Sequence, residues 1–302
     1  MVAYKYRPGR GTKDSEGRDV FMRDLELLSQ DTIYVPTVEQ LNDPAEALMD
    51  DSIFENQLRL FRRLGAGDSV KLVEKSFRDL YDSIRSSGIY SLSKNIDNEL
   101  MWAYYSSGHT GYAIIFDTDV LARSFDYGKW GGMYELEKNY SSKLPRFDMA
   151  KIGGKDLGKA LSCFVGTKSK AWEHEKEQRL VFDKGGRSIK IDYRALKGFV
   201  SGCRMCDEDI NYVMQTFSGR SFEYYQVELK GDTYKLSLKR LADKYPTPEV
   251  YCPNQIAYDI DELLEADKFI EGVGYKYREF VEEALDKVSR EPSVTGILVG
   301  SG

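Results

Sequence analysis

Short runs with the alternation of β-strands recur along the chain at uneven intervals, and they limit its possible folds more than any other feature. Such alternation places successive side chains on opposite faces of a strand. The predicted strands cover residues 2–6, 32–35, 88–93, 112–116, 131–140, 177–182, 189–191, 199–202, 222–229 and 234–241. Their spacing lacks the regular strand–helix rhythm of a doubly wound sheet. We expect an α+β fold with a mixed or split, largely antiparallel sheet, helical insertions and a C-terminal helical element.

Two prolines divide the chain into a strand-rich part and a helical tail. Pro246 and Pro248 follow the last predicted strand, and amphipathic helical spacing resumes after them. We expect a single α+β domain over residues 1–245, with a helical insertion at 45–85. A C-terminal helical appendage is expected over residues 246–302.

The composition is that of a soluble globular protein. Hydrophobic residues make up 41% and charged residues 30% of the 302 positions, and the formal net charge is −6. This charge argues against general nucleic-acid binding through a basic surface. Basic residues interrupt the N-terminal segment, and no run approaches the ~18 apolar residues of a membrane span. We expect a cytoplasmic protein without membrane contact.

Metal and nucleophile motifs are sparse. The two histidines, His109 and His174, do not form a His-x-x-x-His pair, so we expect no zinc. A magnesium site built from carboxylates remains an alternative. Cys203 and Cys206 form a single Cys-x-x-Cys pair, which is most simply explained by idle thiols. No Gly-x-Ser-x-Gly motif indicates a nucleophilic serine.

Residues 168–182 combine a dense set of charges with a predicted strand. Glu177 and Arg179 share one strand face, and Glu175 joins them if the strand begins early. Two carboxylates and a guanidinium would then form a row. The row is either a solvated edge strand or the lip of an active site.

Three groups of residues follow one another in an order that suggests a reaction. Arg7 ends the first strand, Ser91 and Ser93 lie on a middle strand, and Glu175 and Glu177 lead into a later one. An arginine fork suits a pyrophosphate, and serine hydroxyls can hold a glutamate and a ribose. A glutamate can stabilise an oxocarbenium-like transition state as nicotinamide leaves. This order resembles that of ADP-ribosyltransferases of the arginine–serine–glutamate type.

Several longer blocks form a combination that goes beyond these single motifs. They are Tyr4-Lys5-Tyr6-Arg7, Leu41-Asn42-Asp43-Pro44-x-Glu46, Ser91-Leu92-Ser93, Leu100-Met101-Trp102-Ala103-Tyr104-Tyr105 with His109-x-Gly111, Phe116-Asp117, and Lys168-x-x-x-Trp172-x-x-Glu175-x-Glu177-x-Arg179. The combination resembles the bacterial family known as domain of unknown function 2971, over residues 1–205. This family has no established activity. The resemblance implies one shared pattern and an association with bacterial phage defence or toxin systems.

We therefore expect an NAD-dependent ADP-ribosyltransferase-like enzyme or NAD glycohydrolase that acts as an effector in such a system. Its partner would be a protein or nucleic-acid acceptor, or a protein from the same defence locus. The residues predicted to act in catalysis are Glu177, Glu175 and Arg179. The residues predicted to bind NAD, as substrate, are Arg7, Ser91, Ser93, Tyr104, Trp172, Asn42, Asp43 and His109. Trp172 or Tyr104 would form a wall of the nicotinamide pocket.

Two other classes of function remain as alternatives. The same face could bind a nucleotide without turnover, as a sensing or interaction module. It could also carry magnesium-dependent nuclease or phosphoryl-transfer chemistry through Asp43, Glu46, Glu175 and Glu177. The first test is geometric: the arginine, serine and glutamate residues must meet in one cleft.

Overall fold

The computed structural model describes residues 1–50, 52–64, 67–125, 134–146, 164–220 and 222–245. The appendage expected over residues 246–302 lies outside the described residues. The strands are β1 (Val2–Arg7), β2 (Thr32–Val35), β3 (Gly88–Ser93), β4 (Tyr112–Asp117), β5 (Tyr134–Glu137), β6 (Asn139–Ser141), β7 (Thr167–Ser169), β8 (Glu177–Phe182), β9 (Arg187–Lys190), β10 (Leu196–Ser201), β11 (Glu223–Leu229) and β12 (Leu236–Leu241). The helices are α1 (Val20–Ser29), α2 (Ser52–Arg63), α3 (Gly67–Ser86), α4 (Glu99–Tyr105), α5 (Thr118–Arg123) and α7 (Asp207–Thr216), with 3₁₀ helices η1 (Val38–Gln40), η2 (Lys170–Glu175) and η3 (Tyr193–Ala195).

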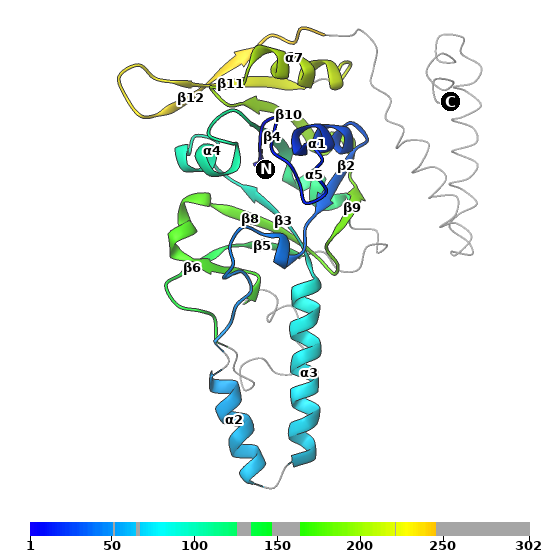
Figure 1. Cartoon of the computed structure of the whole chain (residues 1–302), viewed down its shortest axis with the longest axis vertical. Helices are drawn as coiled ribbons and strands as arrows, with labels where there is room; N and C mark the ends of the chain where they lie inside the picture. The colour runs from blue at the N-terminus through cyan, green and yellow to red at the C-terminus, as the bar shows by residue number, and fades with distance from the viewer. Residues whose placement is uncertain (51, 65–66, 126–133, 147–163, 221, 246–302) are drawn as a thin grey trace, which may run out of the picture. The chain divides into compact units, whose positions relative to one another are not determined.

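One open sheet organises the described residues (Figure 1). Its strand order is β12-β11-β10-β4-β1-β3-β8-β5. All neighbours pair antiparallel except β10 and β11, which are parallel. The expectation of an α+β fold with a largely antiparallel sheet is confirmed. Two further sheets of two strands each are β2-β9 and β6-β7.

Strand β4 is the buried centre that its apolar run predicts. Tyr112 and Phe116 are both buried, as are the three residues between them. The strand pairs with β1 on one side and with β10 on the other, so both of its edges are covered. A run without alternation suits a strand that is buried on both faces.

Helices cover both faces of this sheet. On one face, Phe21 and Leu25 of α1 and Leu121 of α5 join one core with β1, β3 and β4. On the other face, Met101 and Trp102 of α4 pack with residues of β1, β4 and β10. Among the described residues, no helix has the length and apolar character needed to cross a membrane.

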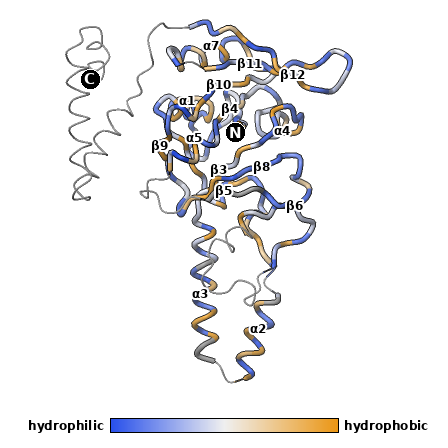
Figure 2. Tube along the Cα trace, turned by 180° about the vertical axis from the view of Figure 1, so that it is seen from behind, coloured by the Kyte–Doolittle hydropathy of each residue, from blue (hydrophilic) through white to orange (hydrophobic). Residues whose placement is uncertain are grey.

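Helices α2 and α3 occupy the range of the expected helical insertion. Hydrophobic and hydrophilic residues alternate along both helices, as amphipathic helices require (Figure 2). Phe54, Leu58 and Ile84 pack with Ile89 of β3 and Val181 of β8. The insertion is thus anchored to the half of the sheet that contains β3 and β8.

The sheet forks between β1 and β3. Strand β1 pairs with β4 over its whole length, and β3 pairs with β8 over its whole length. Between β1 and β3, only Tyr4 and Ser93 are paired. The two strands therefore separate towards Arg7 and Gly88, and backbone groups along the gap need other partners.

The strand that carries the glutamates begins later than one of the alternatives predicts. Glu175 ends the 3₁₀ helix η2, and β8 begins at Glu177. Between them, Lys176 has a φ of 44°, a left-handed conformation that turns the chain. An early strand start at Glu175 is therefore wrong, because the backbone bends before Glu177.

Candidate functional site

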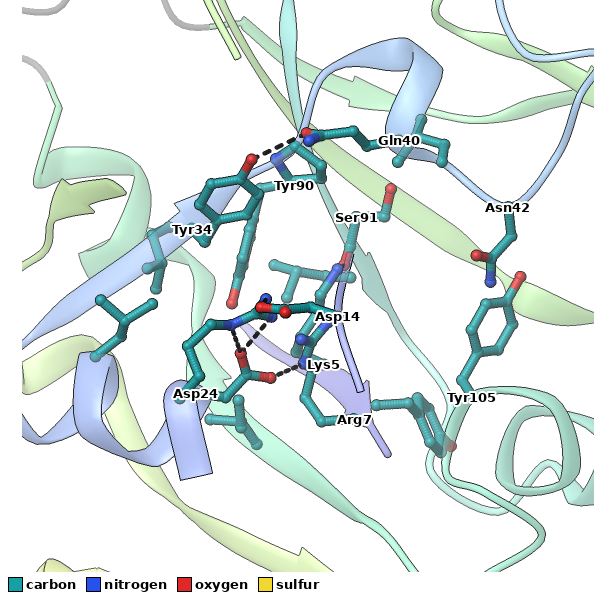
Figure 3. Close-up of a pocket in the computed structure, with 18 of the residues that line it drawn as sticks. Lys5, Arg7, Asp14, Asp24, Tyr34, Gln40, Asn42, Tyr90, Ser91 and Tyr105 are labelled. Carbon is teal, nitrogen blue, oxygen red and sulfur yellow. Dashed lines mark hydrogen bonds and ion pairs between the residues drawn. The ribbon is translucent and has the colours of Figure 1, made fainter. Parts of the chain in front are cut away.

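A cleft of about 930 Å³ lies at the fork between β1 and β3 (Figure 3). Its walls come from β1, β3, α1, the segment after η1, and the charged segment that leads into β8. Eight of the residues predicted to form the site line it: Arg7, Asn42, Asp43, Ser91, Ser93, Glu175, Glu177 and Arg179. Arginine, serines and glutamates from distant parts of the chain therefore line one cleft. The pairing of Tyr4 with Ser93, and of Ser93 with Glu177, places Glu177 on one face of the sheet and Arg7 on the other, so Arg7 lines the cleft from the opposite side of the fork.

A buried ion cluster forms one wall. Alternation along β8 places Glu177 and Arg179 on one face of the strand. The Nε of Arg179 donates to Oε1 of Glu177 over 2.6 Å. Its Nη1 and Nη2 donate to the two carboxylate oxygens of Glu46, over 2.7 and 2.6 Å. A planar guanidinium satisfies two carboxylates in this way through its fork of donors.

Two lysines complete this cluster. Lys168 of β7 donates to Glu175, and to Oε2 of Glu177 over 3.2 Å. Lys138 donates to Oε1 of Glu46 over 3.2 Å. The ion cluster thus contains three carboxylates and three cations: Glu46, Glu175, Glu177, Lys138, Lys168 and Arg179. Their opposite charges offset the loss of hydration that burial imposes.

The two glutamates of the Glu-x-Glu pair differ in their electrostatic surroundings. Burial raises the pKa of Glu175, whose carboxylate accepts hydrogen bonds from Lys168 and from the hydroxyl of Tyr105. Burial alone would also raise the pKa of Glu177, but Arg179 and Lys168 hold it well below its ordinary value. Glu177 is therefore a fixed carboxylate, whereas Glu175 is closer to proton exchange.

Strand β3 and the segment after η1 hold the Glu175 side of the cleft. The hydroxyl of Ser93 donates to the backbone oxygen of Glu175 over 2.7 Å. The side chain of Asn42 lies beside the hydroxyl of Tyr105 (Figure 3). Asp43 caps a turn by accepting from the backbone N–H of Ala45 over 2.9 Å.

The opposite wall is built around Asp24 of α1. The Nε of Arg7 donates to Asp24, which also accepts from Nη2 of Arg23 over 2.9 Å. Arg7 is 25% exposed. Among the described residues, its terminal NH₂ groups donate to no side chain or carbonyl, which leaves them for a ligand in the cleft.

Lys5 is a cleft residue to which the sequence patterns assign no role. Its Nζ crosses the fork and donates to the backbone oxygen of Ser91 over 2.9 Å. The same atom lies 4.7 Å from the centroid of the Tyr90 ring. Burial, and then the positive charge of Arg7, lowers the pKa of Lys5 to about 7. The sequence signal was the alternation that puts Lys5 on the same strand face as Arg7.

The pKa of Lys5 predicts a pH dependence of stability. The unfolded chain keeps a proton on this lysine up to about pH 10, whereas the folded chain releases it near a pKa of about 7. The unfolded state binds more protons between these values, so the free energy of unfolding rises with pH. Between about pH 7 and about pH 9, the wild type should gain about 2 kcal/mol relative to Lys5→Met in urea unfolding. Parallel pH profiles would contradict this assignment.

Three residues predicted to bind NAD do not line the cleft. Tyr104 is 62% exposed, and its ring lies 6.3 Å from that of His174. Trp172 lies outside the cleft lining, with Lys168 Nζ 5.1 Å from its ring centroid. His109 stacks on Trp102 with ring centroids 6.3 Å apart. None of the three lines the cleft, and their part in NAD binding stays a prediction.

A comparison with known protein families matches the part of the chain that carries the ion cluster. The model of a family described as "Protein of unknown function (DUF2971)" matches residues 101–180. No curated protein and no solved structure matches the chain significantly. The matched range includes Lys138, Lys168, Glu175, Glu177 and Arg179, five of the six members of the ion cluster. The resemblance to the DUF2971 family is therefore confirmed over residues 101–180, the part of the chain that carries this wall of the cleft.

Proposed function

We propose that the cleft binds NAD and cleaves the bond between nicotinamide and its ribose, as an NAD glycohydrolase or ADP-ribosyltransferase. One observation carries this proposal: Arg7, Ser91, Ser93, Glu175 and Glu177 line a single cleft. An ADP-ribosyltransferase-like fold is part of the same proposal. The family resemblance favours a cytoplasmic effector of a bacterial phage defence or toxin system, with a protein or nucleic-acid acceptor or a partner protein from the same locus.

We assign pyrophosphate binding to the wall that contains Arg7 and bond cleavage to the wall that contains Glu177. The free NH₂ groups of Arg7 suit the pyrophosphate, because a guanidinium binds phosphate oxygens in pairs. Glu177 is held in place by Arg179 and Lys168, so its charge needs no reorganisation when positive charge develops on the ribose. A fixed carboxylate of this kind lowers the barrier of an oxocarbenium-like transition state.

The reaction balances without an oxidant. The bond between ribose C1 and the nicotinamide nitrogen breaks, and its electron pair leaves with nicotinamide. The oxygen of water, or an acceptor atom, then bonds to C1 and gives up a proton. Glu175 is the group that we propose to take this proton, because burial raises its pKa above the ordinary value of a glutamate.

The charges of the ion cluster favour this chemistry over magnesium-dependent phosphoryl transfer. Glu46 is neutralised by Arg179 and Lys138, and Glu177 by Arg179 and Lys168. A divalent cation would add positive charge to a cluster that is already balanced. Catalytic magnesium sites instead present carboxylates that still carry net negative charge.

A nucleotide-sensing module without turnover is the second candidate. Glu177 is 6% exposed and already accepts three hydrogen bonds, two from Arg179 and one from Lys168. Such a carboxylate can serve stability alone. In that case the cleft would bind NAD or another nucleotide, and the ligand would be recovered unchanged.

The role of Arg7 gives a direct test of binding. Arg7→Met should weaken the binding of NAD about 10–100-fold in titration calorimetry, because the pyrophosphate loses its arginine. Arg23 remains paired with Asp24, so the carboxylate is not left alone. Arg10→Met is the control, since Arg10 forms an exposed pair with Asp209.

The same samples separate the candidate functions. Chromatography after the titration should show nicotinamide if the cleft is an enzyme, and intact NAD if it only senses the nucleotide. Equal affinities of wild type, Arg7→Met and Arg10→Met would mean that Arg7 does not hold the pyrophosphate.

A further inference from the structure

Lys5 occupies the point where the two strands separate. Ser91 presents its carbonyl to the gap, and Lys5 crosses from β1 to satisfy it over 2.9 Å. Lys5 lines the cleft and is half-buried, so a ligand in the cleft can reach it. Among the described residues, its amine forms no ion pair with a carboxylate.

The charges around Lys5 favour the neutral amine. Arg7 and Arg179 oppose its protonation, and burial does so more strongly than either. Glu177 and Asp24 favour protonation, but each of them is already paired with an arginine. The resulting pKa of about 7 leaves roughly half of the lysine neutral near neutral pH, against about one part in 10³ for an ordinary lysine. A desolvated lysine beside another cation is a typical amine nucleophile.

We propose that Lys5 is a nucleophilic amine that forms an imine with a phosphate-bearing aldehyde bound in the cleft. Arg7 is two residues along the same strand face, about 7 Å away along the backbone. Its free NH₂ groups offer a phosphate site at that separation. A phosphorylated sugar in its open-chain form combines both features. The inference does not depend on NAD cleavage.

The step needs no oxidant. The lone pair of Nζ forms a bond with the carbonyl carbon, and one proton passes from the nitrogen to the carbonyl oxygen to give a carbinolamine. The nitrogen lone pair then forms the C=N bond as the hydroxyl leaves, and the hydroxyl takes the remaining N–H proton to give water. The sheet contributes the position of the amine, and Arg7 contributes the anion site.

Pyridoxal 5′-phosphate is the probe, because it carries an aldehyde and a phosphate on one small ring. The full-length chain is incubated with it at neutral pH, without NAD, reduced with borohydride and mapped by peptide mass spectrometry. Lys5 should carry the label at least about tenfold above the exposed Lys13. Pyridoxal without the phosphate should label Lys5 several-fold less, and so should pyridoxal 5′-phosphate on Arg7→Met.

Mapping the wild type makes the result independent of how any variant folds. Lys5→Arg, which keeps the positive charge, should lose the label at this position and no other. Labelling spread over exposed lysines with Lys5 unmodified would overturn the proposal. Labelling of Lys5 that is equal for pyridoxal and its phosphate would overturn the phosphate site. Labelled Lys5 in a chain that leaves NAD intact would refute NAD cleavage alone.

Discussion

Arg179→Met is expected to lower the free energy of unfolding by about 3–5 kcal/mol, as measured by urea denaturation. Arg179 is 1% exposed and pairs with Glu46 and Glu177, which are 2% and 5% exposed in their side chains. Methionine fills the volume but leaves both carboxylates without their main cation. Lys138 and Lys168 remain, but three carboxylates then face two lysines in a site that water hardly reaches.

A surface pair gives the matched control. Arg85 and Glu39 form an ion pair whose side chains are 46% and 65% exposed. Arg85→Met should change the free energy of unfolding by less than about 1 kcal/mol. The double variant Glu46→Gln with Arg179→Met should lose less than the sum of the single variants, because one stranded charge is removed. Equal losses at Arg179 and Arg85 would contradict a buried ion cluster.

Glu177→Gln is expected to slow the formation of nicotinamide from NAD by about 10²–10³-fold. The amide keeps the shape of the side chain but removes the negative charge that would stabilise the ribosyl cation. The loss should fall on kcat, since the charge acts in the transition state more than in NAD binding. The rate is measured by chromatography of the released nicotinamide.

The control for this variant comes from the same segment. Glu173 of η2 is exposed and does not line the cleft, so Glu173→Gln should leave the rate unchanged. Thermal melting of Glu177→Gln must show a folded protein at the assay temperature, because the substitution also weakens the pairs with Arg179 and Lys168. A folded Glu177→Gln chain with the wild-type rate would remove Glu177 from the catalytic role.

The order of apolar and polar residues along single strands predicted which strands are buried and which side chains share a strand face. The continuous apolar run of β4 predicted a strand buried on both faces, and alternation predicted that Glu177 and Arg179 share one face. Neither pattern specifies which residues far apart in the sequence come into contact. The cleft lies at the fork where β1 and β3 pair only at Tyr4 and Ser93, a long-range arrangement that no local pattern specifies.

Residues that reach the site only through tertiary packing could not be identified from the sequence. Lys138 belongs to none of the sequence blocks, and Lys168 begins one of them without a predicted role; only tertiary packing brings both lysines to the carboxylates. Trp172 was expected to form a wall of the nicotinamide pocket, and it lies on the 3₁₀ helix η2 outside the lining residues, with its ring beside Lys168. Neighbours in sequence share a site only when the backbone period puts them on one face.

The initial rate of nicotinamide formation by the purified wild-type chain, with NAD as the only nucleotide and a metal chelator present, tests the central claim most directly. We expect nicotinamide and ADP-ribose in equal amounts, at a rate that the chelator does not change and that Glu177→Gln lowers about 10²–10³-fold. NAD that is recovered intact after prolonged incubation with a folded wild-type chain would contradict it.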